Sequence, residues 1–326
     1  MRTRTFDDTT ATVIGAGDVC LARSAVRGVD RDEVARSLHQ LVALGGSVIE
    51  CSDEVDAAAL VGEVVRAERA RDRVVTVGRV AAASSARVLA RSVQANVEAM
   101  LRACRLDAVP LAVIAPRVAW RDDAAWPELV GVCARLVHDG KVMRWGATID
   151  VADAEAGGAP WLAEPWLVAL RVDMSLCDRR VVKLVDELGE TRAVLVARPL
   201  AGGALVGTLG PGVSLPVRDD RRALDAAALA RVSAGVAALA PFVRAVPVAA
   251  HATELGKQRI EGLVRIEPVE CADVAELALR WAIDRVPNGG IALPRLHRGH
   301  VAAAVAAGSA PPLSRDLLHR LGDLDI

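Results

Sequence analysis

Three short stretches of the sequence bring together side chains that could do chemistry. Residues 50–53 (Glu-Cys-Ser-Asp) place two acids, a thiol and a hydroxyl directly after an apolar run. In residues 198–203, glycines let backbone N–H groups approach a pyrophosphate. In the third stretch, Arg295, His297 and Arg298 precede a predicted helix, and cations beside a helix N-terminus suit a phosphate, although a solvated basic loop explains them equally well. The three stretches indicate acid–base chemistry and anion binding.

Residue types and spacings that the sequence lacks limit the reactions and binding sites to be expected. The chain of 326 residues contains no tyrosine, so no phenol can act as an acid. Its six cysteines are scattered, without a CxxC pair or a His/Cys spacing for metal, so we expect no metal site and reduced, mostly buried thiols. Cys51 is a poor candidate nucleophile because no histidine is placed to activate it.

Composition and charge indicate a cytoplasmic, globular protein. The net charge of −1 gives no sign of a nucleic-acid surface. Charged residues interrupt every long apolar run, so we expect no membrane span. The core must be aliphatic, because Phe6 and Phe242 are the only phenylalanines among 52% hydrophobic residues.

Short apolar runs alternate with longer amphipathic segments along the chain. The expected strands are 11–17, 47–50, 73–79, 109–114, 141–146, 166–172, 191–197 and 289–294. The expected helices are 30–44, 57–69, 92–104, 126–139, 178–188, 224–238, 272–284 and 300–307. About eight strand–helix units counted from residue 47 predict an α/β fold, a (β/α)8 TIM barrel with 1–326 as a single domain. An open doubly wound sheet is the alternative, disfavoured because no G-x-G-x-x-G opens a helix.

Seven segments, in order, resemble the aldo-keto reductases over nearly the whole chain. They are VIGAGDV (13–19), GGSVIECSDEVD (45–56), DRVVTVGRV (72–80), RLDAVPLAVIAP (105–116), HDGKVMRWGAT (138–148), ARPLAGGALVGTL (197–209) and the pair LALRWAIDR (277–285) with IALPRLHRGHV (291–301). The resemblance implies the same barrel, with an active site at its carboxyl-terminal mouth.

The resemblance also implies a tetrad of aspartate, tyrosine, lysine and histidine for carbonyl reduction. At the matching positions this sequence has Glu50, Val55, Arg79 and Ala115. The proton donor and the carbonyl-orienting histidine are therefore missing, and only a carboxylate–cation pair remains. That pair is either a leftover salt bridge or a working group that binds an anionic substrate, with Asp53 as a further candidate acid.

The family's cofactor site is kept in part. The matching phosphate-binding positions are Arg198, Leu200 and Gly202 after the seventh strand, with Arg295, His297 and Arg298 after the eighth. At the nicotinamide end, Arg171 replaces the family's glutamine. NADP(H) binding is therefore doubtful, and residues 201–222, rich in glycine and proline, could form a lid.

Three functions remain open from the sequence. The first is an atypical enzyme that performs an elimination, isomerisation or cyclisation on a small molecule in the barrel mouth. The second is an NADP(H)-dependent oxidoreductase with a substituted proton donor, which would lose about 10²–10⁴ in rate. The third is a non-catalytic regulatory protein with a protein partner.

Overall fold

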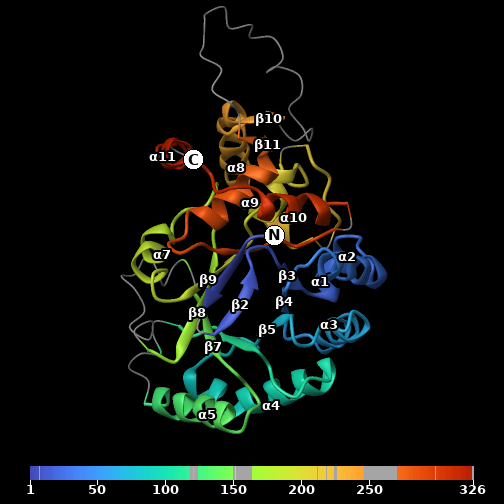
Figure 1. Ribbon diagram of the computed structural model, residues 1–326, viewed down its shortest axis with the longest axis vertical. Helices are drawn as coiled ribbons and strands as arrows, with labels where there is room; N and C mark the ends of the chain where they lie inside the picture. Colours follow the sequence, from blue (N-terminus) through green and yellow to red (C-terminus); the bar gives the residue numbers. More distant parts are fainter. Residues whose placement is uncertain are drawn as a thin grey trace, which may run out of the picture.

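The computed structural model describes residues 1–6, 8–117, 120, 124–149, 151, 164–210, 212–217, 219–223, 226–245, 270–297 and 299–324. Eight parallel strands form one sheet, in the order β12-β9-β8-β7-β6-β5-β4-β3 (Figure 1). Their bounds are β3 (Ala16–Val19), β4 (Val48–Cys51), β5 (Val75–Arg79), β6 (Leu111–Ile114), β7 (Trp145–Ile149), β8 (Leu167–Asp173), β9 (Ala193–Ala197) and β12 (Ile291–Leu293).

The two end strands of this order also meet. Gly15 N–H donates to the Ala292 carbonyl at 3.0 Å, and Gly17 N–H donates to the Pro294 carbonyl at 2.8 Å. A Cβ on Gly17 would collide with the backbone of Leu293, so glycine is needed for this close approach. The sheet therefore closes, and the predicted (β/α)8 barrel is confirmed.

Helices surround the barrel. They are α1 (Leu21–Val26), α2 (Arg31–Ala43), α3 (Val55–Ala67), α4 (Ala86–Cys104), α5 (Trp126–His138), α7 (Val182–Leu188), α8 (Ala226–Ala238), α9 (Val274–Asp284), α10 (Val301–Ser309) and α11 (Arg315–Gly322). The predicted cap of the second helix is present, because Asp30 Oδ1 accepts a hydrogen bond from Glu33 N–H at 2.6 Å. Short 3-10 helices lie at Ala201–Val206 (η3), Asp220–Ala223 (η4) and Ala240–Phe242 (η5).

Aliphatic side chains fill the inside of the barrel, as the scarcity of phenylalanine requires. Val77, Leu111 and Val113 are each at most 2% exposed, and they belong to one inner cluster with Leu195 and Leu293. A second, larger cluster lies between the strands and the helices. The interior of the barrel is therefore a packed core, and a ligand could bind only at its ends.

The start of the chain differs from the prediction. The expected strand 11–17 is divided between two strands: its start belongs to β2 (Thr9–Thr12), which pairs antiparallel with β1 (Thr3–Phe6), and its end belongs to β3. The chain then enters the barrel as β3, which supplies the eighth strand; seven barrel strands, not eight, follow residue 47 in the described residues. A short parallel pair, β10 (Val243–Ala245) with β11 (Cys271–Asp273), was also not predicted.

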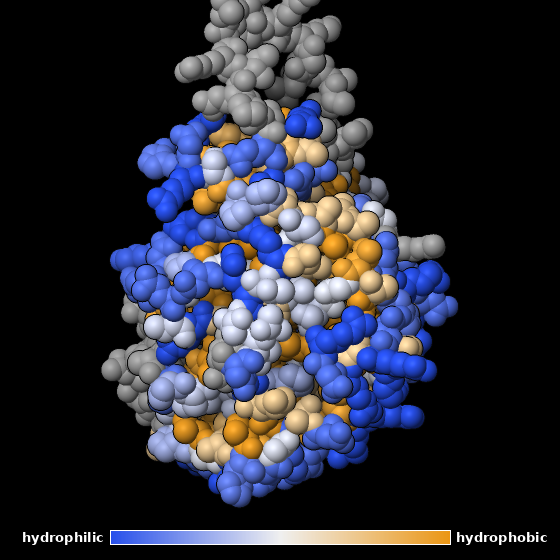
Figure 2. Space-filling view, viewed as in Figure 1, coloured by the Kyte–Doolittle hydropathy of each residue, from blue (hydrophilic) through white to orange (hydrophobic). Residues whose placement is uncertain are grey.

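The surface mixes polar and apolar residues. On the face seen in Figure 2, hydrophilic residues are interspersed with small hydrophobic areas. Two of the most exposed large apolar side chains, Val217 at 87% and Val55 at 58%, are far apart in sequence. In the portion of the chain that the structure describes, no helix combines the length and apolar character needed to cross a bilayer.

Candidate functional site at the barrel mouth

Charged side chains gather where the barrel strands end. We call this set the mouth network; it consists of Asp18, Arg23, Glu50, Arg79, Arg171, Asp173, Arg198 and Arg295, linked by hydrogen bonds or ion pairs. Because the carboxyl ends of parallel strands lie at the same edge, residues distant in sequence converge there.

Glu50 and Arg171 form the centre of the mouth network. Arg171 Nε donates to Glu50 Oε1 at 2.6 Å, with the Glu50 side chain fully buried and that of Arg171 8% exposed. Burial alone would lower the pKa of Arg171, but the charges of Glu50, Asp173 and Asp18, with the hydrogen bond to Glu50, together outweigh it, so that pKa is raised. Arg171, predicted as a cofactor contact, thus closes an ion pair with the predicted catalytic acid.

The predicted pair of Glu50 with Arg79 is present but longer. Arg79 Nε lies 3.6 Å from Glu50 Oε1, whereas its NH1 lies 2.9 Å from Asp18 Oδ1. The Arg79 side chain is 31% exposed, so part of its guanidinium faces the outside of the barrel mouth. Arg79 therefore bridges the two acids and remains accessible to a bound molecule.

Asp18 is a member of the site that sequence reasoning missed. Its backbone has a φ of +49°, and its N–H donates to Glu50 Oε2 at 3.1 Å. Its carboxylate binds Arg23 and Arg295, the latter at 2.7 Å. Burial would raise the pKa of Asp18, but the charges of Arg295, Arg23 and Arg79, with the hydrogen bond from Arg295, together outweigh it and hold that pKa below its usual value. Its position directly after Gly15-Ala-Gly17 was the available signal.

Asp173 and Arg198 form the exposed edge of the mouth network. Arg171 NH1 donates to Asp173 Oδ1 at 3.3 Å, and Arg198 NH1 lies 3.4 Å from Asp173 Oδ2. The Arg198 side chain is 63% exposed and that of Asp173 is 36% exposed. Asp173, at the end of β8, also escaped the sequence analysis, although a charged residue ending a barrel strand could have been noticed. It is an acid of the network that solvent reaches.

The remaining predicted catalytic positions lie apart. Asp53 is exposed and makes no hydrogen bond or ion pair with any described residue. Val55 begins α3 and is 58% exposed, while Ala115 follows β6 and is half-buried. Neither Val55 nor Ala115 carries a group that could donate a proton or hold a carbonyl oxygen.

The predicted phosphate-binding residues are brought to one side of the mouth. Arg295 is engaged with Asp18, and His297 Nδ1 lies 3.8 Å from Glu33 Oε1. Burial lowers the pKa of His297, against the opposing charge of Glu33. The hollow beside Arg295 and His297 has a volume of about 20 Å³, which holds about one water molecule. Arg298 lies outside the described residues.

The loop after β9 holds the other predicted cofactor residues. Leu200 is half-buried and precedes η3, and Gly202 and Gly203 have φ of +67° and +107°, which favour glycine. Their backbone can approach a ligand without a Cβ in the way. No cluster of possible metal ligands occurs among the residues that the structure describes.

The predicted lid, residues 201–222, is tethered at its far end. Asp219 is 3% exposed, and Arg221 NH2 binds its Oδ2 at 2.7 Å. Arg221 NH1 also donates to the carbonyls of Gly202 and Thr208, at 3.1 and 3.2 Å, which folds the loop back on itself. Arg27, just beyond α1, lies 3.9 Å from Asp219 Oδ1. The loop therefore reaches from β9 to the segment that follows β3.

Comparisons with known proteins agree with this architecture. The chain is similar to the glycerol dehydrogenase of Gluconobacter oxydans (17% identity, TM-score 0.69, covering 98% of this chain and 94% of that one). It is also similar to an aldo/keto reductase of Klebsiella pneumoniae in complex with NADP and acetate (22% identity, TM-score 0.60, covering 98% of this chain and 93% of that one). A third similar structure is the holo form of an aldo-keto reductase of Bacillus halodurans (16% identity, TM-score 0.64, covering 99% of this chain and 95% of that one). No curated protein matches the chain. The model of the aldo/keto reductase family matches residues 13–325, and the chain therefore belongs to that family.

Proposed function

We propose that this chain binds a small organic anion at the barrel mouth and moves a proton on it, in an elimination, isomerisation or cyclisation, instead of reducing a carbonyl group. The observation that carries the proposal is the charged Glu50–Arg171 pair at the centre of the mouth, with Asp173 and Arg198 exposed beside it. This arrangement provides cations for an anion and an accessible carboxylate for a proton.

Cations outnumber acids in the mouth network even when Arg23 is left aside. The network then contains four guanidinium groups, those of Arg79, Arg171, Arg198 and Arg295. It contains three carboxylates, those of Asp18, Glu50 and Asp173. Arg198 is the most exposed of these cations. A guanidinium presents two parallel N–H groups to a carboxylate or phosphate, so Arg198 and Arg79 are suited to hold the anionic end of a substrate.

Asp173 is the group best placed to accept a proton. Its carboxylate lies between Arg171 and Arg198, at 3.3 and 3.4 Å, and it is accessible to solvent. A base beside cations can remove a proton next to a substrate carboxylate, because the cations stabilise the negative charge that develops. Glu50 is fully buried against Arg171, which favours a positioning role over contact with substrate.

Tyrosine-dependent carbonyl reduction lacks its essential groups here. The chain has no tyrosine, and Val55 and Ala115 stand where the donor and the orienting histidine are expected. Arg171, at the position expected to hold the nicotinamide, is bound to Glu50. These residues do not fit a nicotinamide, and no step of the proposed chemistry depends on one.

NADP(H) binding is the second candidate. It is supported by the Klebsiella pneumoniae relative, which is in complex with NADP and acetate, and by Gly202 and Gly203 in the loop after β9. Thermal-shift titration with NADPH and NADP+ tests it, because a ligand that binds only the folded state raises Tm. A clear rise in Tm, together with oxidation of NADPH by aldehydes at rates typical of the family, would make NADP(H)-dependent reduction the better-supported function.

The proposed chemistry is tested by proton exchange. Small carboxylic acids with C–H bonds next to the carboxylate are incubated with the purified chain in D2O, and NMR follows deuterium uptake. We expect uptake into at least one acid, a loss of about 10²-fold or more in Asp173→Asn, and little change in Asp53→Asn. Exchange that is equal in Asp173→Asn and the native protein would contradict the role of Asp173.

A further inference from the structure

A hollow of about 520 Å³ lies at the opposite end of the barrel from the mouth network. It is bounded by the first residues of β8, β9 and β12, by the turns that precede β9 and β12, and by β1. Its volume falls within the range of about 300–1,000 Å³ that is typical of sites for small molecules. None of the mouth network residues contributes to it.

The floor of this hollow is apolar. Val168, Ala193 and Ile291 line it, and all three pack on the aliphatic cluster inside the barrel. Ile291 is buried, whereas Val168 and Ala193 are only partly buried, so the lowest layer of the barrel interior is not fully covered there. A compact apolar group placed on this floor would bury surface that the described chain leaves open.

Arg4, from β1, provides a cation at the edge of the hollow. It has no ion pair with a described carboxylate; its NH1 lies 3.5 Å from the Thr3 carbonyl, and its buried Nε has no hydrogen-bond partner. The guanidinium packs over Gly289, where any Cβ would collide with it. Because Nε is buried against Gly289, a ligand acceptor would bind the terminal nitrogens of the Arg4 guanidinium.

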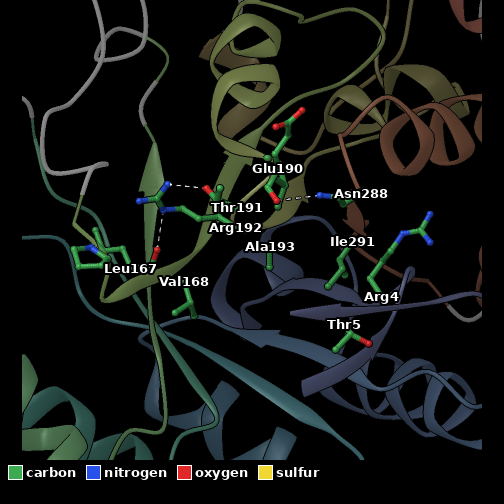
Figure 3. A pocket seen from close by; sticks show the side chains of 14 residues that line it. Arg4, Thr5, Leu167, Val168, Glu190, Thr191, Arg192, Ala193, Asn288 and Ile291 are labelled. Carbon is green, nitrogen blue, oxygen red and sulfur yellow. Dashed lines mark hydrogen bonds between the residues drawn. The ribbon is translucent and has the colours of Figure 1, made fainter. Parts of the chain in front are cut away.

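Arg192 adds positive charge on the other side of the floor. Its Nε donates to the Leu167 carbonyl at 2.9 Å and its NH1 to Thr191 Oγ1 at 3.3 Å, both neutral acceptors. In the view of Figure 3, Arg4 and Arg192 lie on opposite sides, with Ala193 and Ile291 between them. The carboxylate of Glu190 points away from this floor in Figure 3 and is paired with neither arginine.

We propose that this hollow is a second binding site, for a monocarboxylate with a compact apolar body. The carboxylate binds Arg4, which can present two N–H donors, and the apolar body lies on Val168, Ala193 and Ile291. A carboxylate carries one negative charge and therefore matches one unpaired guanidinium better than a multiply charged phosphate does. The apolar floor disfavours a sugar, because a sugar carries many hydroxyl groups.

Calorimetric titration of the full chain with hexanoate tests the proposal, with the neutral hexanamide as its matched probe. We expect binding of hexanoate, and affinity at least about tenfold weaker both for hexanamide and for hexanoate with Arg4→Met, because a charge-assisted hydrogen bond is lost. Arg198→Met removes any hexanoate that the mouth holds, and it should leave the Arg4-dependent binding of hexanoate in place.

A second variant guards against misfolding of Arg4→Met. Ala193→Leu fills the floor without changing charge, and it should weaken hexanoate binding while circular dichroism stays native. The proposal is overturned if the native chain does not bind hexanoate. It is equally overturned if Arg198→Met abolishes binding while Arg4→Met and Ala193→Leu retain it.

Discussion

Glu50 and Arg171 lie on strands four places apart in a ring of eight, yet their side chains meet at 2.6 Å. The pair therefore crosses the barrel from one side to the other. It ties β4 to β8 through a buried ion pair. The stability of the barrel should depend on this connection.

Breaking the Glu50–Arg171 pair on one side should be strongly destabilising. Glu50→Gln or Arg171→Met leaves a buried charge without its partner, so we expect each to lower the free energy of unfolding by about 3–5 kcal/mol. The free energy of unfolding of the double variant Glu50→Gln/Arg171→Met should fall by much less than the sum of the decreases in the two single variants. Denaturant unfolding of all four proteins measures the coupling, and strictly additive losses would contradict it.

Acid should weaken the tether at Asp219. Hydrogen bonds from Arg221 hold the pKa of Asp219 well below its usual value of about 3.9. A depressed pKa in the folded state stabilises the protein above about pH 4, and this stabilisation is lost as the pH falls toward the folded-state value. The Tm of Asp219→Asn should be below that of the native chain at neutral pH, and the difference should shrink toward about pH 3. A difference that does not vary with pH would argue against this tether.

Removing Arg198 should affect anion binding and not folding. Its side chain is 63% exposed and paired only at 3.4 Å, so Arg198→Ala should change the free energy of unfolding by less than about 0.5 kcal/mol. Affinity for the anion identified by proton exchange should fall about tenfold. Arg285→Ala is the matched control, because Arg285 also pairs with an exposed aspartate, Asp186, but lies outside the mouth network. Equal losses in both variants would exclude a specific role for Arg198.

The thiols should differ in their reaction with iodoacetamide. Burial raises the pKa of Cys133 to about 12, and hydrogen bonding to Cys104 together with burial raises that of Cys51. Since the thiolate is the nucleophile, Cys51 and Cys133 should resist labelling in the native protein, whereas Cys20 is half-buried and should react first. Peptide mass spectrometry measures the order, and early labelling of Cys51 would restore it as a candidate nucleophile.

Much of the fold could be predicted because its signals are local. The helix from residue 31 was indicated by the Asp30 cap and by an apolar face that is indeed buried. All eight predicted strands overlap barrel strands, the first of them only at Ala16 and Gly17, because buried parallel strands are short apolar runs. The hairpin of β1 and β2 was missed because its threonine-rich strands carry no apolar alternation, and pairing, not composition, identifies them.

The candidate site was less predictable because its contacts join distant parts of the chain. The sequence placed Glu50 and Arg79 together, but it could not show that Arg171, 121 residues away, is the nearer partner of Glu50. Asp18 and Asp173 were overlooked for the same reason. Each joins the site only because closure of the barrel places the end of its strand beside an arginine. The predicted phosphate contact Arg295 is engaged with Asp18, which no local pattern could reveal.

The glycine contact between β3 and β12 has a consequence for biosynthesis. The first barrel strand finds its last neighbour only after residues 291–293 have been translated. Until then, a nascent chain carries an open sheet with two unpaired edges, which are prone to association with other chains. Ring closure must therefore follow synthesis of residues 291–293, and chaperones that shield strand edges should raise the yield of native protein.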